Sequence, residues 1–207
     1  MRLLSRRFTL ASAVPMALLA AASAAPAGPV EVRVSDASGR PLAGAVVFLE
    51  SREAHDAVRP AQGIEIAQAG KQFVPQVTVV PVGSAVSFPN RDTVRHHVYS
   101  FSPVRKFEIK LYVGTPASPV VFDQPGIGVL GCNIHDQMAA WVVIVDTPWS
   151  GQTGADGRHG WPRIPPGDYR LRTWHPSLPV GAVPADQALH VDAGPALASV
   201  RLTGLTP

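Results

Sequence analysis

The only cysteine of this 207-residue chain, Cys132, lies in the segment LGCNIHDQMAAW (130–141) together with a histidine and a methionine. Cys132, His135 and Met138 follow one another at intervals of three residues, so a thiol, an imidazole and a thioether lie close together in the chain. Soft sulfur ligands combined with imidazole favour copper. The segment therefore predicts a copper site whose second histidine ligand must come from another part of the chain.

Other roles of Cys132 are weaker alternatives. A single cysteine cannot close a disulfide within the chain, so it is an intermolecular partner, a free thiol or a metal ligand. A free thiol is disfavoured if the protein is exported, as the N-terminal segment described below predicts, because unpaired thiols oxidise outside the reducing cytoplasm. Zinc also binds Cys and His, but one thiolate, two imidazoles and a thioether suit copper better, and copper binds more tightly in general.

The missing histidine can come from FPNRDTVRHHVYSF (88–101), which contains His96 and His97. Neighbouring side chains on a strand point to opposite faces, so only one of the two can easily face the metal. Elsewhere the chain has no nucleophile elbow, glycine-rich phosphate loop or zinc-protease helix motif. The residues thus favour a metal-binding protein over a hydrolase or a nucleotide-binding enzyme.

The first 24 residues predict a cleaved signal peptide, with a basic start, a short apolar stretch and the small residues Ala22-Ser23-Ala24 at the cleavage site. We therefore expect a periplasmic protein with no membrane span in the mature chain. Removing Arg2, Arg6 and Arg7 leaves 15 basic residues against 15 acidic ones. With no net positive charge, nucleic acid is not an expected partner.

The 21 prolines and 18 glycines interrupt the chain too often for long helices, and valine-rich stretches lie between them. This pattern predicts an all-β protein with many turns. Residues 51–63 show no periodicity and read as a linker, and 153–168 read as loop and turn. The expected strands are 30–34, 45–50, 73–80, 85–88, 96–101, 107–112, 120–122, 127–130, 140–145, 169–173, 188–191 and 197–202.

Residues 60–146 resemble the cupredoxins of the amicyanin and plastocyanin type. The shared features are the spacing C-x-x-H-x-x-M from Cys132, the six-residue interval from Asn90 to His96, and the entry FVPQVTVVPVGSAVSFPN (73–90). The resemblance implies a Greek-key sandwich holding one type 1 copper through His96, Cys132, His135 and Met138. His96 is preferred over His97 by register, although His97 and Arg95 replace the Asn and Pro usual in these relatives. The resemblance to cupredoxins also implies a hydrogen-bonded link between the two ligand-bearing loops through Asn90 and Asn133.

Two distant segments, VEVRVSDASGRPLAGAVVFLE (30–50) and TGADGRHGWPRIPPGDYRLRTW (153–174), resemble the small transthyretin-like, carboxypeptidase-regulatory type of β-sandwich. The cupredoxin segment separates them. We therefore predict a discontinuous domain, residues 29–53 plus 147–207, carrying the copper domain 60–146 as an insertion. The alternative is one enlarged sandwich in which residues 29–53 extend a sheet.

The function expected from these resemblances is the transfer of single electrons between redox proteins, such as a c-type cytochrome or a dehydrogenase, by a monomer that is not an enzyme. The alternative is an accessory or recognition module in which copper is structural or stored. The overall pattern also resembles a loosely named methylamine utilisation group, which suggests amine oxidation as a context. Nitrite reduction is the weakest hypothesis because the sequence offers no second copper site.

Overall fold

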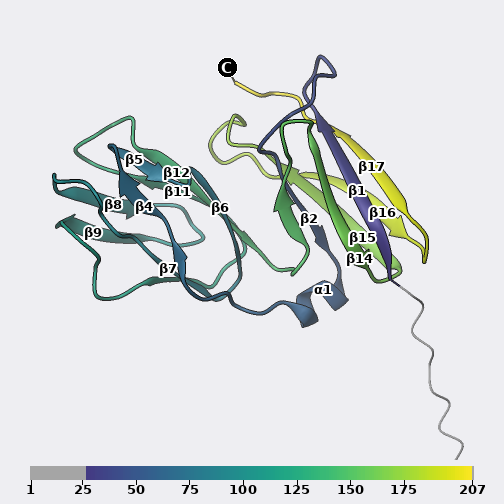
Figure 1. The fold of residues 1–207 in the computed structure, drawn as a ribbon, viewed down its shortest axis with the longest axis horizontal. Helices are drawn as coiled ribbons and strands as arrows, with labels where there is room; N and C mark the ends of the chain where they lie inside the picture. The colour runs from purple at the N-terminus through teal and green to yellow at the C-terminus, as the bar shows by residue number, and fades with distance from the viewer. Residues whose placement is uncertain (1–26, 207) are drawn as a thin grey trace, which may run out of the picture.

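The computed structural model describes residues 27–206, so the predicted signal peptide lies outside the described part of the chain. The described residues form strands and one short helix, which confirms the all-β expectation. None of the helices in residues 27–206 is long and apolar enough to cross a membrane. Two groups of strands lie side by side, each around its own apolar core (Figure 1).

The first group, here called the flanking unit, combines the beginning and the end of the described chain (Figure 1). Val32, Leu49 and Leu171 are fully buried between its two sheets, although more than 100 residues separate the first from the last. Alternating buried and exposed positions in β1 and β15 explain why these segments form strands with one face on the core. One sheet contains β14 (Arg158–Ile164), β1 (Gly28–Ser35) and β17 (Ala196–Arg201), and the other β13 (Ser150–Gln152), β2 (Val46–Glu50), β15 (Gly167–Trp174) and β16 (Ala185–Val191).

The second group, here called the central unit, is built from residues 64–145 and contains the segments with the predicted ligands. Phe88, Phe122 and Leu130 are buried in its core. The five-stranded sheet has the order β6 (Val77–Pro81), β12 (Ala139–Val145), β11 (Gly126–Gly131), β8 (His96–Ser100) and β9 (Phe107–Tyr112). The remaining strands are β10 (Val120–Phe122), β7 (Ser84–Ser87) and β3 (Ile64–Glu65), and the pair β4 (Ala67–Ala69) and β5 (Gln72–Val74).

An apolar interface joins the two units. Strand β12 is buried on both faces: Val142 and Ile144 belong to the core of the central unit, whereas Val143 and Val145 pack with Trp174 and other flanking-unit side chains. Successive residues of a strand point to opposite faces, so one strand can serve both cores. The same interface includes a tilted contact between Trp141 and Trp174, whose ring centroids are 6.3 Å apart.

The prediction of an unstructured linker over 51–63 is wrong in part, because Arg52–Ala57 form the helix α1. Ser51 accepts a hydrogen bond from the backbone N–H of Ala54 and so caps the first turn. His55 of this helix lies 2.5 Å from a carboxylate oxygen of Asp146, in the second connection between the units. The segment that leads from the flanking unit into the central unit is therefore joined to the segment that leads back. The periodicity of the sequence does not indicate this contact.

Two strand predictions also need correction. The expected strand 73–80 is divided into β5 and β6, which belong to different sheets. The segment 158–164, predicted as loop, forms β14, which pairs with β1 at the edge of its sheet. Proline is tolerated at a bulge or where its N side faces solvent, and the register of β14 with β1 shifts opposite Pro162, between Gly28 and Val30. A prediction from local propensity therefore assigns the segment around Pro162 to a loop, although it forms a strand.

Candidate metal centre

Neighbouring strands bring the two ligand-bearing segments together. His96 is the first residue of β8, and Cys132 directly follows β11, which pairs with β8 through Gly131 and Tyr99. His135 lies in the short loop between β11 and β12. A hydrogen bond of 2.9 Å from the Met138 N–H to the His135 carbonyl folds this loop back on itself. The topology thus places two segments that are 36 residues apart at one end of the sheet.

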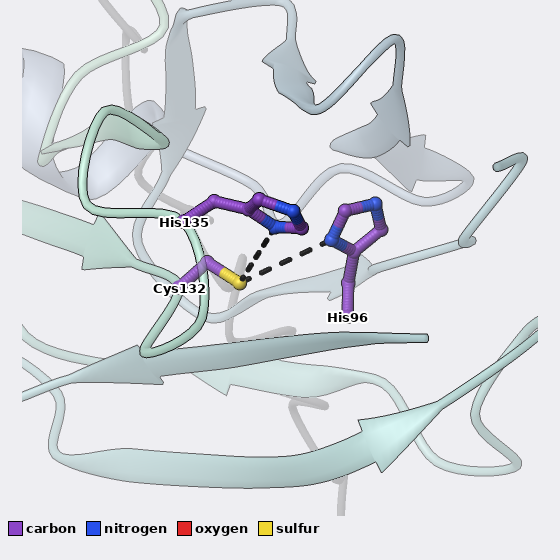
Figure 2. A group of neighbouring side chains, drawn as sticks. All are labelled: His96, Cys132 and His135. Atoms are coloured by element: carbon purple, nitrogen blue, oxygen red, sulfur yellow. Dashed lines mark hydrogen bonds between the residues drawn. The ribbon is translucent and has the colours of Figure 1, made fainter. Parts of the chain in front are cut away.

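The donor atoms of His96, Cys132 and His135 converge (Figure 2). The sulfur of Cys132 lies 4.0 Å from Nδ1 of His96 and 4.0 Å from Nδ1 of His135. All three donor atoms lie within 4.8 Å of one another, and within residues 27–206 this is the one such group of His, Cys, Asp or Glu side chains. The imidazole rings are tilted by 56°, with centroids 5.0 Å apart.

These separations fit a single soft metal ion. Bonds of about 2.3 Å to sulfur and about 2.0 Å to nitrogen, roughly 120° apart, would separate sulfur from each nitrogen by about 3.7 Å. The observed 4.0 Å requires only a small contraction. One thiol and two imidazoles are also the donor set that copper accepts. The residues present therefore fit the ion that the sequence predicts.

Burial shapes the surroundings of this cluster. Cys132 is 2% exposed and His96 is fully buried, whereas His135 is only partly buried. Met138 is 2% exposed and belongs to the same apolar core as Cys132. Its part as a fourth, weak ligand stays a prediction. The site therefore has two buried donors and one histidine near the surface.

Asp92 orients His96. One carboxylate oxygen of Asp92 lies 2.7 Å from Nε2 of His96, and the backbone N–H groups of Gly70 and Lys71 donate to Asp92 at 2.7 and 2.9 Å. A carboxylate that accepts the Nε2 proton leaves the lone pair of Nδ1 facing Cys132. The hydrogen bond from Lys71, followed by that from His96, lowers the pKa of Asp92 below its ordinary value.

The other histidine of the pair has a different partner. Nε2 of His97 lies 2.9 Å from Oε1 of Glu108 on β9, and the side chain is buried. A register irregularity between His96 and Val98 accompanies the burial of both histidines. The structure thus brings His96, and not His97, to Cys132 and His135.

Asn90 has a structural role that differs from the expected link between ligand loops. Its side-chain amide donates to the carbonyls of Val94 and Tyr112 at 2.8 and 2.9 Å, and its oxygen accepts from the Asp92 N–H. These bonds hold the segment before β8 against the end of β9. The expected hydrogen bond toward Asn133 is not among them, and Asn133 is exposed.

Tyr112, the last residue of β9, is the register partner of His96 on β8. Its hydroxyl donates to the carbonyl of Phe88 at 2.7 Å. Burial raises the pKa of Tyr112 well above its ordinary value, and the nearby Cys132 adds to the shift. Tyr112 and Asp92 are both missed by reasoning from the sequence. The only available signal for Asp92 is a carboxylate four residues before a candidate ligand, because its anchoring turn at 70–71 is distant in sequence.

Comparison with known proteins found matches among solved structures. No family model and no curated protein matches the chain. A match to a purple cupredoxin from Nitrosopumilus maritimus covers 40% of this chain and 100% of the cupredoxin, with 19% identity and a TM-score of 0.36. A point mutant of amicyanin in its reduced Cu(I) form matches 48% of this chain and 98% of its own, with 21% identity and a TM-score of 0.37.

A match to a copper-containing nitrite reductase from Thermus scotoductus SA-01 covers 54% of this chain and 28% of the reductase chain, with 19% identity and a TM-score of 0.38. The structural neighbours are thus cupredoxins at low identity and partial coverage. Similarity this low says nothing about the chemistry of this site, which is argued from its own geometry.

Proposed function

We propose that this chain is an exported type 1 copper protein that carries single electrons between larger redox partners. The observation that carries the proposal is the convergence of Sγ of Cys132 with Nδ1 of His96 and of His135, at 4.0 Å each. A site with these donors in a largely buried pocket is suited to a copper ion held firmly in both of its common oxidation states.

The chain's own residues would have distinct tasks. Cys132 would lose its proton on binding the metal, since the thiolate is the ligand. Asp92 would keep His96 in the tautomer that presents Nδ1, and the folded loop would present His135. Met138 would be the weak fourth ligand. Bound copper would supply one-electron chemistry.

The proposal includes a direction of electron exit. His135 is only partly buried and Ile134 is 47% exposed, so the ligand loop reaches the surface at an apolar position. A c-type cytochrome or a dehydrogenase would dock there weakly, with Ala139 beside the loop, and the carrier would act in the periplasm as a monomer. With four protein ligands no position would remain for a substrate, which favours a carrier over an enzyme.

Copper reconstitution tests the proposal. We expect one equivalent of Cu(II) to produce an intense visible absorption band, by resemblance to blue-copper proteins, and cytochrome c to oxidise and reduce the site reversibly. Cys132→Ser should abolish the band, whereas His190→Gln, at an exposed position of the flanking unit, should leave it unchanged. If Cys132→Ser keeps the band, the ligand assignment is wrong. Copper that binds but does not cycle would favour the accessory role.

A further inference from the structure

A cavity of about 850 Å³ lies between the two units, directly against the metal centre. Cys132 and Met138 of the ligand loop contribute to its wall from one unit, and the segment 179–184 contributes from the other. This volume is within the range of about 300–1,000 Å³ that is typical of small-molecule sites, which often form where two structural units meet.

The wall of the cavity is aromatic and apolar. Tyr99, Phe101, Trp141 and Trp174 all line it. Phe101 is 74% exposed, and Val180 and Val183 in the segment 179–184 are each 80% exposed. Large apolar side chains left exposed around a concave surface mark a binding site more often than chance, because their exposure to water has a free-energy cost. Planar ring faces select planar ligands.

The charge of the wall narrows the ligand class. Among the described residues that line the cavity, Asp136 is the one with a charged side chain, and no lysine, arginine or histidine is present. An anionic ligand would find no opposite charge and would lose its hydration on entering. Because Asp136 is exposed, its own charge is screened by solvent and gives a cation little attraction.

We infer that this cavity binds a neutral, planar aromatic molecule, held between the aromatic side chains of the central unit and the apolar segment 179–184 of the flanking unit. This inference goes beyond the proposed electron transfer and does not depend on it. The aromatic molecule would bind to the apolar wall of the cavity, which includes Cys132 and Met138, whether or not a metal is bound. Trp141 and Trp174 report occupancy directly because both line the cavity.

Two fluorescent probes that differ by one charged group test the inference. N-phenyl-1-naphthylamine is neutral and aromatic, and 8-anilinonaphthalene-1-sulfonate is a comparable aromatic amine with a sulfonate. We expect the purified protein to bind one equivalent of the neutral probe, with energy transfer from tryptophan, and at least tenfold more tightly than the sulfonate. No saturable binding, or equal affinity for both probes, would overturn the inference.

Paired variants locate the site. Phe101→Ser should weaken binding of the neutral probe about five- to tenfold, the order expected for losing one aromatic contact. Leu197→Ser, at a position 56% exposed and outside the cavity, should change it less than twofold. Ala182→Trp should narrow the cavity and weaken binding, whereas Ala188→Trp on β16, outside the cavity, should not. Equal effects within each pair would place the probe elsewhere. Copper binding is measured separately, so failure here leaves the electron-transfer proposal standing.

Discussion

Replacing Asp92 by asparagine tests how the fold prepares His96 for a metal. Asp92 accepts three hydrogen bonds, from the Gly70 and Lys71 N–H groups and from Nε2 of His96. Asparagine has the same shape, but one of its two terminal atoms is a donor and its charge is lost. At least one of the three bonds must therefore be lost or reversed, and the others become ordinary neutral bonds, which are about half as strong.

The expected effect is a weaker metal site in a folded protein. Removing the outer partner of a ligating histidine generally lowers metal affinity about 10- to 100-fold. We expect Asp92→Asn to weaken copper binding about 30-fold, which corresponds to about 2 kcal/mol at about 1.4 kcal/mol per tenfold. Competition with a chelator of known Cu(I) affinity at constant pH measures this change, and circular dichroism checks the fold.

The matched control is Asp123→Asn, an exposed position of the central unit. It should leave copper affinity within about twofold of that of the unchanged protein. If Asp92→Asn behaves like this control, then Asp92 does not prepare His96, and the tautomer of His96 must be set in another way. A large loss of structure in Asp92→Asn would instead show that the turn at 70–71 depends on Asp92 for folding.

Three further predictions concern other parts of the molecule. His97→Gln should keep copper affinity within about twofold, because His97 pairs with Glu108 and lies outside the cluster, and a loss as large as that of His96→Gln in the same titration would contradict this. Val143→Ala should lower the free energy of unfolding in urea by about 2 kcal/mol, because Val143 is 1% exposed in the interface between the units; an unchanged value would show that the interface contributes little. Hydrogen bonds from Ser38 and Arg40 lower the pKa of Asp36 to about 2. Its stabilising effect is therefore present above pH 3.8 and lost as the pH falls toward 2, so the difference in melting temperature between the unchanged protein and Asp36→Asn should shrink over that interval.

The sequence by itself determined the local chemistry. The interval of three residues from Cys132 to His135 and on to Met138 already puts three donors in one short loop, whatever the rest of the chain does. Frequent Gly and Pro residues between valine-rich stretches likewise predict a β-rich chain, because both properties depend on neighbours in sequence. The failures, at α1, at β14 and at the division of 73–80 into β5 and β6, are segments whose structure depends on a cap or on distant partner strands.

Only the tertiary structure decided which distant groups meet. The pairing of β8 with β11 brings His96 to Cys132, and the turn at 70–71 fixes Asp92 beside it. The contact of β12 with Trp174 and the cavity next to it depend on packing between units that are separate in sequence. Such contacts follow from long-range strand register and shape complementarity, which no local spacing of residues specifies.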